Sequence, residues 1–241
     1  MTGTGSLRHQ IAGASSPMRF VLNATILAVL TILAAPLDAQ SYMFNRADYA
    51  TGIGPETIAV GDFNGDGRLD VVVGNTLSPE HTVSVLLGNA DGTFAPAVDY
   101  AAGGQPSSVA VGDFNGDGNL DIVVLYGFVN ASVGVLLGDG TGKFKPVMVT
   151  TAGPGGGSIA VGDFDGDGNL DVAIADNLSP SLGVDVMLGN GTGTFKAPVS
   201  YATASDPRMV VVSDFNGDKK LDLATINSVT ETVSVLLGTG T

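Results

Sequence analysis

The sequence predicts an all-β fold, a β-propeller of four four-stranded blades, from a long internal repeat, short apolar segments and turns rich in glycine. The phrase IAVGDFNGDGRLDVVV starts at Ile58 and returns with small changes at Val109, Ile159 and Val210. The first aspartates of the four copies are 51, 50 and 51 residues apart. A period of this length is typical of blades that bury their faces against their neighbours.

Each repeat contains four expected strands. Two strands flank the aspartate-rich phrase, and a third lies in a second phrase, VSVLLGNADGTF, whose copies end at Phe94, Phe144 and Phe195. The fourth follows that phenylalanine, as in APAVDYAAG from Ala95. The runs Val71–Val73 and Val83–Leu87 show little polar alternation, which predicts sheets covered on both faces. The expected blades span residues 53–103, 104–153, 154–204 and 205–241.

The last blade lacks a fourth strand of its own in this scheme. The segment FNRADYATG at residues 44–52 resembles the fourth strand of the other repeats, so we expect it to complete the blade at 205–241. Closure of this kind would remove exposed sheet edges. The sequence leaves two architectures open, a closed four-blade ring and a partial propeller.

The N-terminus has the pattern of a secretory signal. Arg19 precedes an apolar run from Phe20 to Ala35, and small residues allow cleavage after Ala39. This run of 16 residues is shorter than the roughly 20 that a bilayer needs, so no membrane span is expected in the mature chain at 40–241. Residues 1–39 are therefore assigned to the signal region, with Met18 as a second candidate start. Export to the medium or cell surface is expected, with the periplasm as the alternative.

Four aspartate-rich loops are the candidate metal sites. Oxygen-bearing residues alternate along each loop, and a glycine after the third one permits the sharp turn by which a loop wraps Ca²⁺. The expected ligands are Asp62, Asn64, Asp66, the Arg68 carbonyl and Asp70; Asp113, Asn115, Asp117, the Asn119 carbonyl and Asp121; Asp163, Asp165, Asp167, the Asn169 carbonyl and Asp171; and Asp214, Asn216, Asp218, the Lys220 carbonyl and Asp222. Up to four Ca²⁺ ions are expected. The Asp214 site should be the weakest, because Lys219 replaces the turn glycine and Lys220 adds positive charge.

Other interpretations of the loops are less favoured. An ordinary Asp-Gly turn needs no metal, but four copies with every alternate oxygen are hard to explain as turns. An EF-hand requires a bidentate glutamate at the twelfth place, where Val73, Val124, Ile174 and Thr225 stand. The net charge of -14 attracts cations and disfavours nucleic acid as a partner. The absence of cysteine excludes disulfides and thiolate metal sites.

The phrases GDFNGDGxLD and VSVLLGNxxGTF resemble the FG-GAP and VCBS-like repeats of extracellular proteins and the calcium loops of the integrin α propeller. The resemblance covers residues 44–241. It implies a β-propeller whose loops bind calcium and whose roles centre on adhesion and ligand recognition. Members commonly have seven blades, whereas this chain has four repeats.

No catalytic constellation is evident in the sequence. His81 is the one histidine after the signal region, and nothing near it supplies a nucleophile and an orienting partner. A non-enzymatic module that binds an extracellular protein or glycan is therefore the leading hypothesis. A carbohydrate-active hydrolase or lyase and a structural fragment of a larger propeller are the alternatives. Tyr126 and Phe128 interrupt the repeat and are the candidates for a recognition surface, with local packing as the favoured alternative.

Overall fold

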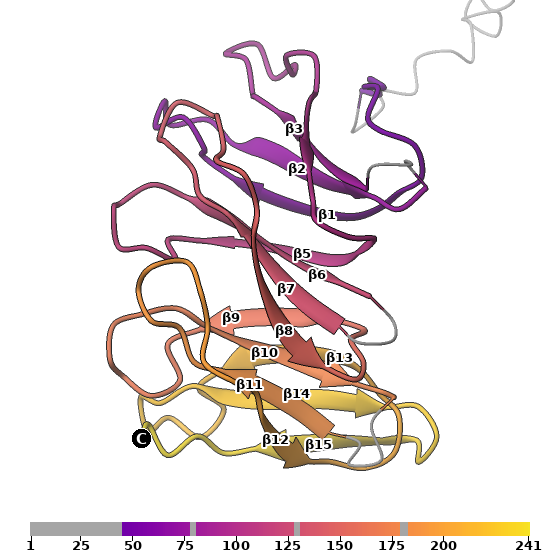
Figure 1. The fold of residues 1–241 in the computed structure, drawn as a ribbon, viewed down its shortest axis with the longest axis vertical. Coiled ribbons are helices and arrows are strands. Elements are labelled where there is room, and N and C mark those ends of the chain that lie inside the picture. The colour runs from indigo at the N-terminus through magenta and orange to yellow at the C-terminus, as the bar shows by residue number, and fades with distance from the viewer. Residues whose placement is uncertain (1–44, 78–80, 128–130, 179–182) are drawn as a thin grey trace, which may run out of the picture. The chain divides into compact units, whose positions relative to one another are not determined.

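The computed structural model describes residues 45–77, 81–127, 131–178 and 183–241, and these form an all-β structure without helices (Figure 1). Ala47–Thr241 is one compact unit. The described residues contain 15 strands in four antiparallel sheets, which confirms the all-β part of the predicted fold class. The expected signal region and Phe44 lie outside the described residues. No helix in the described part of the chain has the length and apolarity to cross a bilayer.

Three of the sheets have four strands each. The first contains β1 (Pro55–Gly61), β2 (Asp70–Asn75), β3 (Thr82–Leu86) and β4 (Val98–Ala101). The second contains β5 (Pro106–Gly112), β6 (Asp121–Tyr126), β7 (Ala131–Leu136) and β8 (Met148–Gly153). The third contains β9 (Ile159–Gly162), β10 (Asp171–Asp176), β11 (Gly183–Met187) and β12 (Val199–Ala202). The fourth sheet has the three strands β13 (Pro207–Ser213), β14 (Asp222–Asn227) and β15 (Thr232–Leu236).

A proline opens the first strand of three sheets. Pro55, Pro106 and Pro207 pair with the last residue of the second strand, and the register shifts directly after each of them. Proline has no N–H to donate to a sheet and is tolerated at the first residue of a strand or at a bulge. This repeated proline therefore marks where each of these sheets begins.

The core lies between successive sheets. Val72 and Val85 of the first sheet share a buried cluster with Ile122 and Val124 of the second. The intervening residue Val123 instead joins a cluster between the second and third sheets. A third cluster joins the third and fourth sheets. Apolar side chains on both faces of one strand explain why these runs lack polar alternation.

Aromatic pairs extend the first two of these interfaces. Phe63 of the first repeat meets Phe144 of the second edge to face, with ring centroids 5.4 Å apart. Phe114 and Phe195 repeat the arrangement between the second and third repeats at 5.9 Å. Such pairs contribute about 0.5–1.5 kcal/mol beyond the area they bury. Phe144 and Phe195, which end the second phrase of their repeats, therefore pack against the preceding repeat.

The strand expected at 44–52 is missing from the described part of that segment. Residues 45–52 carry no strand, and β15 pairs with β14 alone among the described residues. Tyr49 instead packs on Phe94 of the first repeat, with ring centroids 5.4 Å apart. The described residues show no closed ring, because contacts connect the first sheet to the second, the second to the third and the third to the fourth.

Tyr126 belongs to the core. It is buried in the cluster between the first two sheets, and its ring lies against Gly104 and Gly134. This burial excludes Tyr126 as part of an exposed recognition surface and supports the packing alternative. Phe128, the other candidate, lies outside the described residues.

Candidate metal centre

Each aspartate-rich loop joins the first and second strands of its sheet, and its first aspartate organises the turn. In the second loop, the Asp113 carboxylate accepts hydrogen bonds from the N–H groups of Gly116 at 2.7 Å and Gly118 at 2.8 Å. Both glycines are left-handed, with φ of 71° and 83°. This conformation costs glycine little, and it turns successive N–H groups inward.

The other loops repeat this geometry. Asp62 accepts from the N–H of Gly67, Asp163 from those of Gly166 and Gly168, and Asp214 from those of Gly217 and Lys219. Four loops of different sequence therefore share one backbone conformation. These N–H donors, which the sequence pattern does not reveal, partly offset the mutual repulsion of the carboxylates.

The last aspartate of each loop is fully buried and links two distant parts of the sheet. Asp121 accepts from the N–H of Phe114 at 2.9 Å and from the N–H of Gly138 at 2.7 Å. Asp70, Asp171 and Asp222 make the same pair of bonds in their own sheets. A carboxylate oxygen can accept more than one hydrogen bond, so this role leaves lone pairs for a cation.

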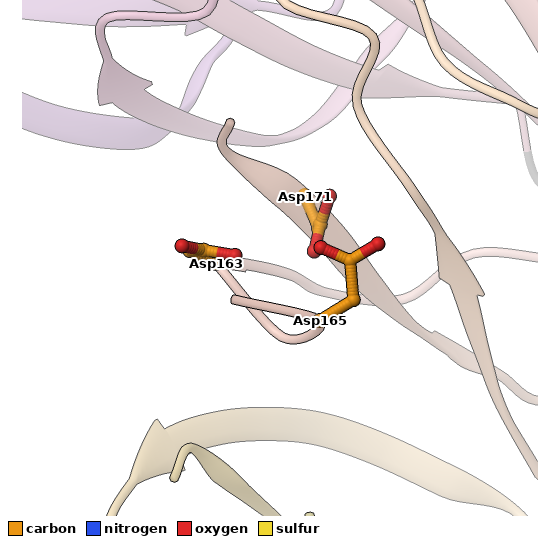
Figure 2. A group of neighbouring side chains, drawn as sticks. All are labelled: Asp163, Asp165 and Asp171. Atoms are coloured by element: carbon orange, nitrogen blue, oxygen red, sulfur yellow. The ribbon is translucent and has the colours of Figure 1, made fainter. Parts of the chain in front are cut away.

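The third loop brings three carboxylates together. Asp163 and Asp165 on the loop and Asp171 at the start of β10 each offer an oxygen, and these atoms lie within 4.8 Å of one another (Figure 2). Ca²⁺ takes about six to eight hard oxygen ligands at roughly 2.3–2.6 Å. The donor set in the described residues is all oxygen and anionic, and therefore fits Ca²⁺. Asp167, the remaining acidic residue of this loop, accepts from the N–H of Asn169.

The first, second and fourth loops have asparagine where the third has Asp165. Asn64, Asn115 and Asn216 supply an amide oxygen there, and the amides of Asn115 and Asn216 donate to Asp117 and Asp218. In the first loop, the Arg68 guanidinium forms an ion pair with Asp66. The acidic residues of these loops thus already have partners that a cation would have to replace or share.

The seventh residue of each loop was expected to offer its carbonyl, and its side chain is engaged elsewhere. The Arg68 side chain donates to the Gly88 carbonyl, and the Lys220 ammonium donates to the Thr239 carbonyl. The Asn119 and Asn169 side chains lie against Gly140 and Gly191. Each side chain thus reaches the turn after the third strand, and that of Arg68 also pairs with Asp66 in its own loop.

The carboxylates of a loop differ in acidity. Hydrogen bonds from the N–H groups of Gly67 and Lys219 lower the pKa of Asp62 and of Asp214. Burial has the opposite effect, raising the pKa of Asp121 to about 6 and raising that of Asp171. The exposed ends of the loops therefore stay ionised well below neutral pH, as cation ligands must.

The fourth loop carries the strain expected from its sequence. Lys219 has a φ of 70°, where Gly67 has 80°, Gly118 83° and Gly168 90°. A residue with a side chain pays about 1–2 kcal/mol for this conformation. The strain and the added positive charge both disfavour a cation in this loop.

We therefore predict that Asp218→Ala lowers the calcium-dependent stability less than Asp66→Ala, by about 1 kcal/mol. Thermal melting of each variant with calcium and with chelator measures the difference. Asp91→Ala, in a turn outside the loops, is the control and should show the calcium dependence of the unaltered chain. Equal losses in the two loop variants would contradict the ranking.

The glycine of the LLG phrase is a structural residue that the sequence analysis did not explain. A Cβ on Gly138 would lie 2.3 Å from the Leu120 carbonyl oxygen, and the same clash occurs at Gly88, Gly189 and Gly238. The N–H of each of these glycines donates to the buried aspartate of its sheet. The similar spacing of the LD and LLG phrases, 16 to 18 residues in the four repeats, was the available signal for this contact.

A second buried acid lies in the third sheet, away from the loops. Asp185 on β11 accepts a hydrogen bond from the Ser200 hydroxyl, and Asp176 lies close enough to interact with it. Burial raises the pKa of Asp185, the Ser200 hydroxyl opposes this effect, and the charge of Asp176 adds to it.

Because the folded pKa of Asp185 lies above the unfolded value, its contribution to stability is greatest at low pH and is lost as the pH rises through the folded pKa. We predict that Asp185→Asn flattens this loss above about pH 4, the pKa of an unfolded aspartate. Denaturant unfolding of both proteins over a pH series tests the prediction. A variant whose stability falls with pH as steeply as that of the unaltered chain would refute it.

Comparison with known proteins agrees with this architecture of repeated sheets with aspartate-rich loops. The family model of the FG-GAP-like repeat matches residues 62–124, 125–174 and 163–225, which together exceed half of the chain. The chain belongs to the FG-GAP-like repeat family. No curated protein matches it.

Two solved structures are similar at low identity. The V. cholerae biofilm matrix protein Bap1 matches at 20% identity with a TM-score of 0.41, over 76% of this chain and 38% of that one. BBS1N in complex with ARL6DN matches at 14% identity with a TM-score of 0.33, over 78% of this chain and 80% of that one. The chain thus spans 38% of the length of the biofilm matrix protein.

Proposed function

We propose that this chain is an extracellular, non-catalytic binding module whose propeller-like blades are stabilised by Ca²⁺. The convergence of Asp163, Asp165 and Asp171 within 4.8 Å, in a loop whose conformation recurs in every repeat, is the observation that carries the proposal. The FG-GAP-like repeat supports it, because calcium binding and recognition are what that resemblance implies. The partner would be an extracellular protein or glycan.

Calcium in this proposal is structural. The first and last aspartates of a loop would hold the ion between the turn and the sheet. In the third loop, Asp163 accepts a hydrogen bond within the turn, and Asp171 accepts from the N–H groups of Phe164 and Gly189. An ion at this place would neutralise the clustered charge and fix the hairpin to the third strand. The acidic residues recur four times in the same setting, which favours a structural role over a single catalytic centre.

Calorimetric titration of the full chain with calcium, combined with melting in calcium and in chelator, tests the metal site. We expect up to four bound ions and a higher melting temperature in calcium. A single site filled at a hundredfold excess over its Kd adds about 2.7 kcal/mol. If calcium gave no heat of binding and did not change the melting temperature, calcium stabilisation would be refuted.

Two variants of the third loop sharpen this test. Asp165→Asn gives the third loop the residue that the other three loops have at this position, and should weaken binding only moderately. Asp163→Ala removes the ligand that organises the turn, and should abolish one binding event. Array screens against glycans and extracellular proteins, with and without calcium, test the recognition part separately.

A further inference from the structure

The fourth sheet presents an open apolar face. Val211, Val233 and Val235 on this face are about half exposed or more, and Phe215 of the fourth loop is 50% exposed. In each preceding sheet the corresponding face is covered. Val85 and Val135, which stand where Val235 does, are buried against the next sheet, and Phe63, which stands where Phe215 does, is 1% exposed.

The first sheet presents the complementary face. Ile58, Val60 and Leu69 are exposed there. Their counterparts in the second sheet, Val109, Val111 and Leu120, pack into the cluster with the first sheet. The same kind of interface forms three times between successive repeats of the chain. Both of the faces that make it are therefore exposed on one chain, one on the first sheet and one on the fourth.

The fourth sheet also has an unpaired edge where the other sheets have a fourth strand. A pocket of about 230 Å³ lies beside this edge, lined by Phe164, Tyr201 and Leu236 among other residues. In the two preceding interfaces, a phenylalanine ring packs on the residue that corresponds to Phe164. An exposed strand edge beside apolar surface is a template for pairing with another chain.

The segment before β1 has the features of such a fourth strand. Tyr49 precedes Pro55 by the same number of residues as Tyr100 precedes Pro106. Tyr49 packs on Phe94 as Tyr100 packs on Phe144, with centroids 5.4 Å apart in both pairs. Residues 45–52 thus lie against the first sheet as β4 and its following residues lie against the second.

We infer that a second copy of this chain binds head to tail, its first sheet covering the open face of the fourth sheet and its residues 45–52 adding a strand to β15. Phe215 of one copy then meets Phe94 of the next, as Phe63 meets Phe144 within the chain. The interface is heterologous, so assembly continues to a ring or a filament rather than stopping at a two-fold dimer.

One position departs from the internal interfaces. A Cβ on Gly61, Gly112 or Gly162 would meet a leucine of the following sheet at 2.5–2.8 Å, and Ser213 stands at this place in the fourth sheet. The incoming Leu69 must therefore shift or displace the Ser213 side chain. This contact makes the association between copies weaker than the packing within a chain, and Ser213→Gly should tighten it.

Sedimentation velocity of the full chain over a wide concentration range tests the inference. We expect a mass that rises with concentration, and Val235→Asp should weaken association roughly tenfold or more because it buries an unpaired charge. Val149→Asp is the matched control, since Val149 on β8 is 55% exposed and Val235 is 53% exposed. A single-chain mass at every concentration, or equal effects of the two variants, would overturn the inference.

Cross-linking distinguishes a second copy from closure within one chain. The sequence has no cysteine, so Phe215→Cys and Phe94→Cys each introduce a unique thiol. Mixing the two variants with a short bis-maleimide should give a covalent dimer, whereas mixing Phe215→Cys with Thr141→Cys should not. No dimer from the first mixture, together with an intrachain cross-link in the double variant, would overturn the inference in favour of a closed ring.

Discussion

Replacing Asp121 with alanine is expected to lower the free energy of unfolding by about 2–4 kcal/mol in chelator. The carboxylate is fully buried, and it accepts from the N–H groups of Phe114 and Gly138. Each buried donor left without an acceptor costs about 1–3 kcal/mol, and relief of the buried charge offsets part of this loss. Urea unfolding with excess chelator measures the change without any contribution from bound metal.

Two further variants separate the structural role of Asp121 from its role as a ligand. Asp117→Ala removes an exposed carboxylate of the same loop, which accepts from the N–H of Asn119, and should cost little in chelator. Asp121→Asn keeps one acceptor but directs an amide N–H at a backbone donor, so it should fall between the other two. If Asp121→Ala proved as stable as Asp117→Ala in chelator, the hydrogen bonds of Asp121 would not hold the sheet together.

The loop aspartates are expected cation ligands and also accept hydrogen bonds from backbone N–H groups. The sequence predicts the first role but not the second. Alternating oxygens in GDFDGDG, the phrase of the third repeat, indicate a cation loop, and the structure brings Asp163 and Asp165 together. The partner of Asp171 in Gly189 is 18 residues away in sequence. A contact of this kind depends on the register of β10 against β11, which the local pattern does not reveal.

The fold was predictable for a related reason. A strand such as β6 buries alternate side chains against two different neighbouring sheets, as Ile122 and Val123 do, so its sequence is apolar throughout. The end sheets carry the same sequence pattern, although one face of each is open. Local sequence therefore predicts the strands but cannot distinguish a covered face from an uncovered one. The expected pairing with the last sheet is likewise absent within residues 45–52, because it depends on the placement of distant sheets and not on local sequence.

The same distinction predicts unequal costs for one substitution at equivalent positions. Phe63→Ala should lower the free energy of unfolding by about 3–5 kcal/mol, the usual range for a buried phenylalanine. Phe63 is buried between the first two sheets, meets Phe144 edge to face, and its carbonyl accepts from the N–H of Gly142. Phe215→Ala should cost less than about 1 kcal/mol in dilute solution, because the ring lies on the open face and leaves no cavity.

Denaturant unfolding of both variants at low protein concentration measures this difference. The two residues share the GDF or SDF phrase, the loop conformation and the hydrogen bond from their own N–H to the buried aspartate. Both variants are compared with the same unaltered chain, in which Ser213 and Lys219 are already present, so the difference between the two costs reports chiefly the contribution of the neighbouring sheet. Raising the protein concentration should then increase the cost of Phe215→Ala if a second copy covers that face, while the cost of Phe63→Ala should stay constant. Equal costs for the two variants in dilute solution would mean that the fourth sheet is already covered within a single chain.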